Sequence, residues 1–69
     1  MTDKSMHHWR AALGETMYDR NITQFTGRRI LQYIGTFKMP EEKEMLAEKA
    51  TDCVAKGMSE QEIMKELGL

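Results

Sequence analysis

The lone cysteine, Cys53, in a chain of 69 residues limits how this protein can be stabilised, because one thiol cannot form an internal disulfide. A chain this short buries only about 60% of the surface that it exposes when unfolded, so its own core supplies roughly 3–5 kcal/mol. Short chains commonly add a disulfide, a metal or a partner subunit. The other soft metal ligands, His7 and His8, are adjacent to each other and distant from Cys53, so we predict no metal site. The remaining routes are self-association, a different partner protein or an unusually well-packed helical core, and we favour self-association as a homodimer.

The composition is typical of a globular chain, since 41% of the residues are hydrophobic and 30% are charged. We expect one domain over residues 1–69. No apolar run approaches the ~20 residues that span a membrane. The first nine residues, MTDKSMHHW, lack the apolar segment of a signal peptide. Together with the single cysteine, these features predict a cytoplasmic protein that makes no contact with a membrane.

Charge is divided unevenly along the chain. Residues 1–39 carry six Lys and Arg against three acids, whereas residues 40–69 carry four Lys against eight acids. The first part is therefore net positive and the second part net negative. Either the two parts attract each other, within one chain or between two chains, or the basic part faces an acidic partner, nucleic acid or protein.

The middle of the sequence contains a strong signal for a long helix. Proline is tolerated at the first helical position, and Pro40 is followed by two glutamates that favour the positive end of the helix dipole. Gly57 is typical of the residue just after a helix end. We predict a helix over about 40–56. Its expected apolar stripe comprises Met45, Leu46, Ala50, Cys53 and Val54.

A short helix is predicted to follow over about 60–67. Ser59 and Glu62 have the spacing of a capping box, in which each side chain bonds the backbone N–H of the other residue. The segment 57–69 also resembles the opening helix and turn of helix-turn-helix DNA-binding domains, which often contain serine, two residues, Glu-Ile and then Leu-Gly. In that family the recognition helix follows the turn. The acidic character of the segment repels phosphate, so its pattern favours packing.

The first half of the chain gives weaker signals. Spacings of three and four predict a helix capped by Ser5 and ending near Asp19, with apolar residues Met6, Trp9, Ala12, Leu13 and Met17. Residues 22–37 fit either a helix capped by Thr26 or a hairpin that turns at Thr26 and Gly27. We favour the helix, because an isolated two-stranded hairpin is poorly stable. The predicted fold class is all-α, a small bundle of three or four helices.

Candidate binding residues cluster around two adjacent arginines. Arginine holds carboxylate or phosphate, and aromatic residues anchor protein interfaces or stack on unpaired bases. Trp9 is interpreted either as the centre of the core or as an anchor for a partner. The predicted partner-binding residues are Trp9, Arg28, Arg29, Tyr33 and Phe37. The alternative nucleic-acid site comprises Arg20, Arg28, Arg29 and Lys38.

Catalysis has little support in the sequence. There is no glycine-rich phosphate loop and no serine nucleophile motif, and a cysteine on the apolar stripe of a helix is usually inert. We predict no enzyme activity and no cofactor. The expected function is that of a small regulatory or adaptor protein that occludes or scaffolds a partner protein. The alternative is a small DNA- or RNA-binding regulator that uses the basic segment 20–38.

Overall fold

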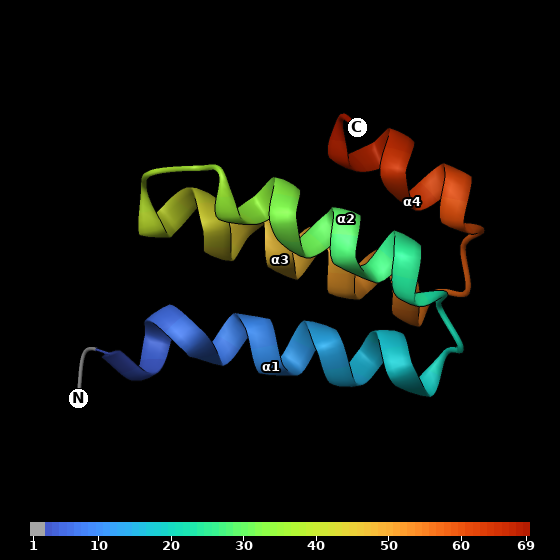
Figure 1. The fold of residues 1–69 in the computed structure, drawn as a ribbon, viewed down its shortest axis with the longest axis horizontal. Coiled ribbons are helices and arrows are strands. Elements are labelled where there is room, and N and C mark those ends of the chain that lie inside the picture. Colours follow the sequence, from blue (N-terminus) through green and yellow to red (C-terminus); the bar gives the residue numbers. More distant parts are fainter. Residues whose placement is uncertain (1–2) are drawn as a thin grey trace.

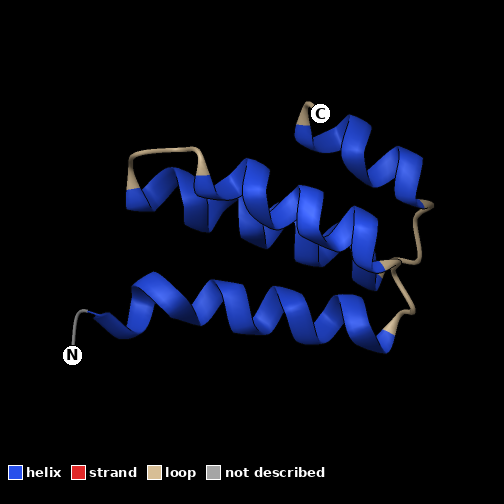
Figure 2. Cartoon of the chain, viewed as in Figure 1, coloured by secondary structure: helices blue, strands red, loops and turns tan. Residues whose placement is uncertain are grey.

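The computed structural model describes the backbone of residues 3–69 and the side chains from Trp9 onward. This part of the chain forms helices joined by short turns and contains no strand (Figure 2). The predicted all-α class is therefore confirmed, and the ambiguous segment 22–37 is mainly helix. The four helices are α1 (Asp3–Asp19), α2 (Gln24–Gly35), α3 (Pro40–Ala55) and α4 (Glu60–Leu67).

The first three helices lie side by side, and the shorter α4 lies alongside α2 and α3 on the side away from α1 (Figure 1). Helix α3 is central, because it contacts each of the other three helices, and its contact with α1 is the most extensive. Ala47 and Ala50 are buried on α3. Since the separation of packed helices depends on the side chains between them, these small residues allow a neighbouring helix to lie close to α3.

The hydrophobic core draws on all four helices. Trp9, Leu31 and Tyr33 are among the half-buried side chains that pack against its edge. Because an apolar side chain gains roughly 1.5–3 kcal/mol on full burial, this cluster is the main source of stability. The buried members are Leu13, Met17, Ile30, Ile34, Ala47, Ala50, Cys53, Val54, Ile63 and Leu67.

One member of the predicted apolar stripe on α3 is misplaced. Met45 was expected in the core, but 71% of its surface is exposed, and Ala47 is buried instead. At about 100° per residue, Met45 lies about 140° around the helix from Ala50. The buried face of α3 is centred on Ala50 and Val54, so Met45 points away from it.

The local signals around α4 are confirmed. The Ser59 hydroxyl accepts a bond from the Glu62 backbone N–H, and the Glu62 carboxylate accepts from the Ser59 N–H, both at 3.2 Å. Before this cap, Gly57 adopts a left-handed φ of 80°. The Met58 N–H then bonds the Cys53 carbonyl at 3.3 Å, which closes the end of α3 in a glycine-based cap.

Two predicted helix starts are wrong. Thr23, not Thr26, caps α2, and its hydroxyl accepts a bond from the Thr26 N–H. Thr26 is instead a buried residue within the first turn. Ser5 does not cap α1, because the helix already begins at Asp3. Both errors arise because several adjacent polar residues can cap a helix, so the sequence alone does not fix which one does.

Candidate docking surface

The outward side of α2 presents an aromatic residue next to two arginines. Phe25, Arg28 and Arg29 occupy positions i, i+3 and i+4, so they share one side of the helix, and all three are exposed. Ile30 and Ile34 occupy the opposite side and are fully buried. The amphipathic pattern of α2 thus fixes the orientation of the helix. We call the exposed set Phe25, Arg28 and Arg29 the α2 docking surface.

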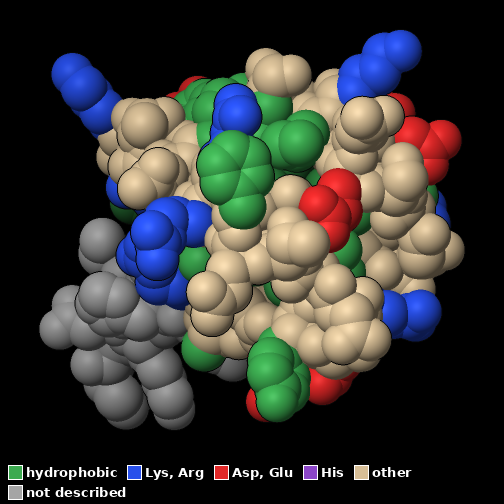
Figure 3. All heavy atoms as spheres, turned by 45° about the vertical axis from the view of Figure 1, so that its right-hand side comes forward, with side chains coloured by type: hydrophobic (Ala, Val, Ile, Leu, Met, Phe, Trp, Pro, Cys, Tyr) green, Lys and Arg blue, Asp and Glu red, His purple; other side chains and the backbone are tan. Residues whose placement is uncertain are grey.

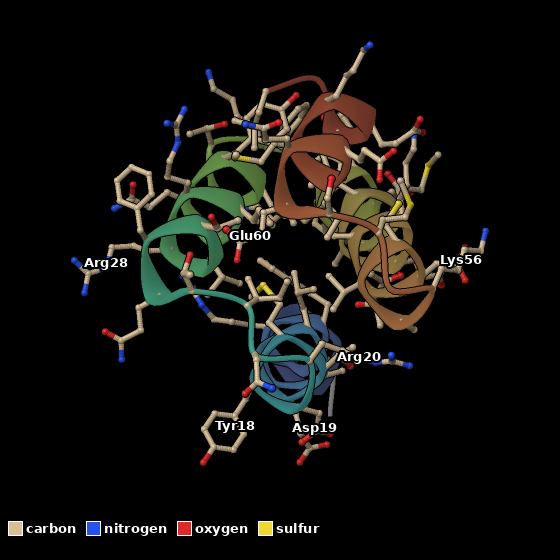
Figure 4. The ribbon with its side chains drawn as sticks, turned by 90° about the vertical axis from the view of Figure 1, so that its right-hand side faces the viewer. Tyr18, Asp19, Arg20, Arg28, Lys56 and Glu60 are labelled. Atoms are coloured by element: carbon tan, nitrogen blue, oxygen red, sulfur yellow. The ribbon has the colours of Figure 1, made fainter. Side chains whose placement is uncertain are left out.

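The side chains of this surface place a guanidinium group against an aromatic ring. The Arg29 guanidinium carbon lies 5.7 Å from the centroid of the Phe25 ring, a cation–π arrangement. Phe25 itself is 70% exposed. Arg28 points away from the bundle into solvent (Figure 4). The surface therefore combines a large apolar side chain with two cations.

Neither arginine is neutralised by a described acid. Among side chains 9–69, the structure contains one ion pair, between Asp52 and Lys56 within α3, at 3.0 Å. The basic and acidic parts of the chain are therefore not joined by ion pairs between described residues. Consequently, the interpretation that their charges attract each other within one chain gains no support from this geometry.

Two other predicted partner residues are paired with each other: Tyr33 lies farther along α2, and Phe37 lies in the turn after it. The Tyr33 and Phe37 rings meet edge to face, with centroids 5.3 Å apart. Both are half-buried, and Tyr33 packs against the core. A Cβ added to Gly68 would lie 3.2 Å from the Tyr33 hydroxyl, so this ring also adjoins the end of α4. This aromatic pair contributes to packing as well as to the surface.

Trp9 lies on α1 rather than on the α2 docking surface. It is half-buried at the edge of the core, and the Arg10 guanidinium carbon lies 5.8 Å from its ring centroid. Of the two interpretations, the position at the core is closer to what is observed, although the side chain is at the margin rather than the centre. The side chains of His7 and His8 lie outside the described residues.

The four cations of the alternative nucleic-acid site are not brought together. Arg20 follows the end of α1 and points to the other side of the molecule from Arg28 (Figure 4). Lys38 is exposed in the turn after α2, at the opposite end of that helix from Phe25. Only Arg28 and Arg29 share a surface. Proximity in the sequence was misleading here, because a turn separates Arg20 from α2.

Behind the docking surface, a carboxylate from α4 fixes the start of α2. Glu60 accepts bonds from the Thr26 hydroxyl at 2.6 Å and from the Thr23 backbone N–H at 3.0 Å. The Thr23 hydroxyl lies 3.1 Å from the same carboxylate. Glu60 points between α2 and α4, whereas Arg28 points outward (Figure 4). This bond network holds the first turn of α2, which carries Phe25.

These hydrogen bonds also affect titration. The Thr26 hydroxyl, followed by the Thr23 backbone N–H and hydroxyl, lowers the pKa of Glu60 below its ordinary value, because each bond stabilises the carboxylate. Glu60 is not among the site residues predicted from the sequence. Its only local signal is an acid at the first position of α4, which is common at helix starts and does not indicate a contact with α2.

On the face shown in Figure 3, hydrophobic side chains reach the surface directly beside Lys and Arg side chains. Within the described residues, none of the helices combines the length and apolar character that crossing a membrane requires. Comparison with protein-family models, curated proteins and solved structures gives no significant match to this chain. Functional inference therefore depends on the physical properties of the surface itself.

Proposed function

We propose that this protein is a small adaptor that binds an acidic partner protein on the α2 docking surface. The observation that carries the proposal is the exposed Phe25 ring beside Arg28 and Arg29, none of which is used by the core or by a described ion pair. Aromatic residues and arginine are enriched among residues that dominate binding energy. The protein would occlude or scaffold its partner, with no chemistry of its own, in the cytoplasm.

The roles of the individual residues follow from their positions. Phe25 supplies apolar contact area, and Arg28 and Arg29 orient a carboxylate-bearing segment through directed hydrogen bonds. Tyr33, on α2, and Phe37, in the turn after it, extend the contact. The network around Glu60 holds the first turn in place, which lowers the conformational cost of binding. Trp9, which packs against the core, has no role in binding in this proposal.

A small nucleic-acid binder is the second candidate. The observation that favours it is the Arg29 guanidinium over the exposed Phe25 ring, because aromatic rings and arginine both stack on unpaired bases. We rank it lower because only two of the four predicted cations share a surface, and nucleic-acid binding normally uses a broad basic patch.

The test is capture of partners from a lysate of the source organism, with and without nuclease. The variant Phe25→Gln/Arg28→Gln/Arg29→Gln removes the docking surface while keeping good helix formers. Tyr18→Gln is the matched control, because Tyr18 is an 83% exposed aromatic residue on α1.

The adaptor proposal expects one protein that resists nuclease and is retained by wild type and Tyr18→Gln but lost from the triple variant. Recovery of DNA or RNA that leaves at moderate salt would favour the nucleic-acid candidate instead, since counterion release makes such binding strongly dependent on salt. A partner retained equally by all three proteins would show that the α2 docking surface is not the site.

A further inference from the structure

The outward side of α3 carries an acidic surface whose charge is opposite to that of the α2 docking surface. At its centre is Met45, which is 71% exposed. Residues three and four positions away on a helix are its surface neighbours. For Met45 these are Glu41, Glu42, Glu48 and Lys49, all exposed. We call Met45 with Glu41, Glu42 and Glu48 the α3 acidic surface.

The two surfaces are complementary in charge and in apolar character. Helix α2 contains no acidic residue and presents Phe25 beside two arginines. The α3 acidic surface presents one methionine among three glutamates, with Lys49 as the one cation beside it. Methionine is flexible and makes favourable contacts with aromatic rings. Because the described part of the chain has no ion pair between α2 and α3, these charges remain available to a second molecule.

The surfaces lie on opposite sides of the molecule. Lys56 follows Met45 by eleven positions, which is about 20° around the helix axis, so it marks the same side of α3. In Figure 4, Lys56 and Arg28 point away from each other on opposite sides of the bundle. Two rigid copies therefore cannot make this contact twice around a two-fold axis. A contact of this kind adds copies in one direction instead.

We propose that the α3 acidic surface of a second copy occupies the α2 docking surface, so that copies of this chain associate head to tail. Phe25 would meet Met45, and Arg28 and Arg29 would meet the surrounding glutamates. In place of the expected homodimer, this contact would form an open chain of copies that can grow at its ends. The inference shares the α2 docking surface with the proposed function but requires no other protein, and a partner protein would compete with the second copy.

The experiment is sedimentation velocity over a series of protein concentrations, at low and moderate salt. The α2 variant is Phe25→Gln/Arg28→Gln/Arg29→Gln, and the α3 variant is Glu41→Gln/Met45→Gln/Glu48→Gln. Every replaced residue is exposed, so folding is retained and is checked by circular dichroism. Tyr18→Gln again serves as the control.

The expected result is growth of the wild type and of Tyr18→Gln beyond dimers as concentration rises, weakened by salt because exposed charges are screened. Each variant alone should need about a tenfold higher concentration or more to associate. An equimolar mixture of the two variants contains one intact surface of each kind. It should therefore form dimers that do not grow further.

Two results would overturn the inference. One is a wild type that stays monomeric at every concentration. The other is a dimer that does not grow and that neither variant weakens, because that behaviour indicates a two-fold contact elsewhere. Neither result bears on the capture experiment, since a partner protein can bind the α2 docking surface of a monomer. Conversely, failure to capture a partner leaves the sedimentation result intact.

Discussion

The two sides of α2 differ in how their side chains are packed. The inner side places Ile30 and Ile34 in the core, where neither side chain has any exposed surface. The outer side places Phe25, Arg28 and Arg29 in solvent. Both sides contain large side chains, but only the inner one is constrained by packing. We infer that stability depends on the inner side and that binding depends on the outer side, and single substitutions can separate the two.

The largest expected effect is on the inner side. Ile34→Ala should lower the free energy of unfolding by about 2–5 kcal/mol, because it removes buried methyl groups and leaves a cavity. Since the whole core of such a chain supplies roughly 3–5 kcal/mol, the variant should keep little of its stability. Urea denaturation followed by circular dichroism measures this. A loss below about 1 kcal/mol would mean that the site relaxes or that the core is not centred here.

A smaller effect of opposite sign is expected at Gly27, also on the inner side. A Cβ at this position would lie 3.6 Å from the Met17 Cε atom, which is ordinary van der Waals contact. Gly27→Ala should therefore raise the free energy of unfolding by about 1 kcal/mol, because alanine restricts the unfolded chain and favours helix. Gly35→Ala, at the exposed end of α2, is the control and should gain less. A destabilised Gly27→Ala would indicate tighter packing of α1 on α2.

The junction between α2 and α4 should respond to pH. Because the pKa of Glu60 is lowered in the folded state, its contribution to stability is complete above the ordinary glutamate pKa and is lost as pH falls through the lowered value. Glu60→Gln keeps an acceptor but removes the charge. The stability difference between wild type and variant should therefore be largest near neutral pH and should shrink in acid. Urea midpoints measured across pH test this, and a constant difference contradicts it.

The smallest effect on stability is expected on the outer side. Phe25→Gln replaces a 70% exposed ring, so the free energy of unfolding should change by no more than about 0.5 kcal/mol. The same denaturation experiment compares it directly with Ile34→Ala. A loss as large as that of the core variant would show that Phe25 supports the fold, and the distinction between the two sides of α2 would fail.

Much of the secondary structure was predictable because its signals are local. Pro40 marks the start of α3, Gly57 follows its end, and the Ser59–Glu62 pair caps α4 as the spacing predicts. Each device connects residues within a few positions of one another, so the sequence alone contains it. The apolar period likewise placed Leu13 and Met17 in the core.

The candidate site was predictable only in part. Arg28 and Arg29 share a surface because they lie three and four positions after Phe25 on one helix, but Arg20 and Lys38 do not join them. Phe25 was not among the predicted binding residues, and its exposure could not be read from its position. Deciding between core and surface for such a residue requires the directions of the neighbouring helices.

The sequence by itself determined that the chain is helical, where α3 and α4 begin and end, and that its charge is uneven. These properties depend on backbone preferences, short-range caps and composition. Only the tertiary structure decided that Met45 faces solvent, that Thr23 rather than Thr26 caps α2, and that Glu60 bonds Thr26 across 34 positions of sequence. Such choices depend on which helix lies opposite each face, and no local pattern contains that information.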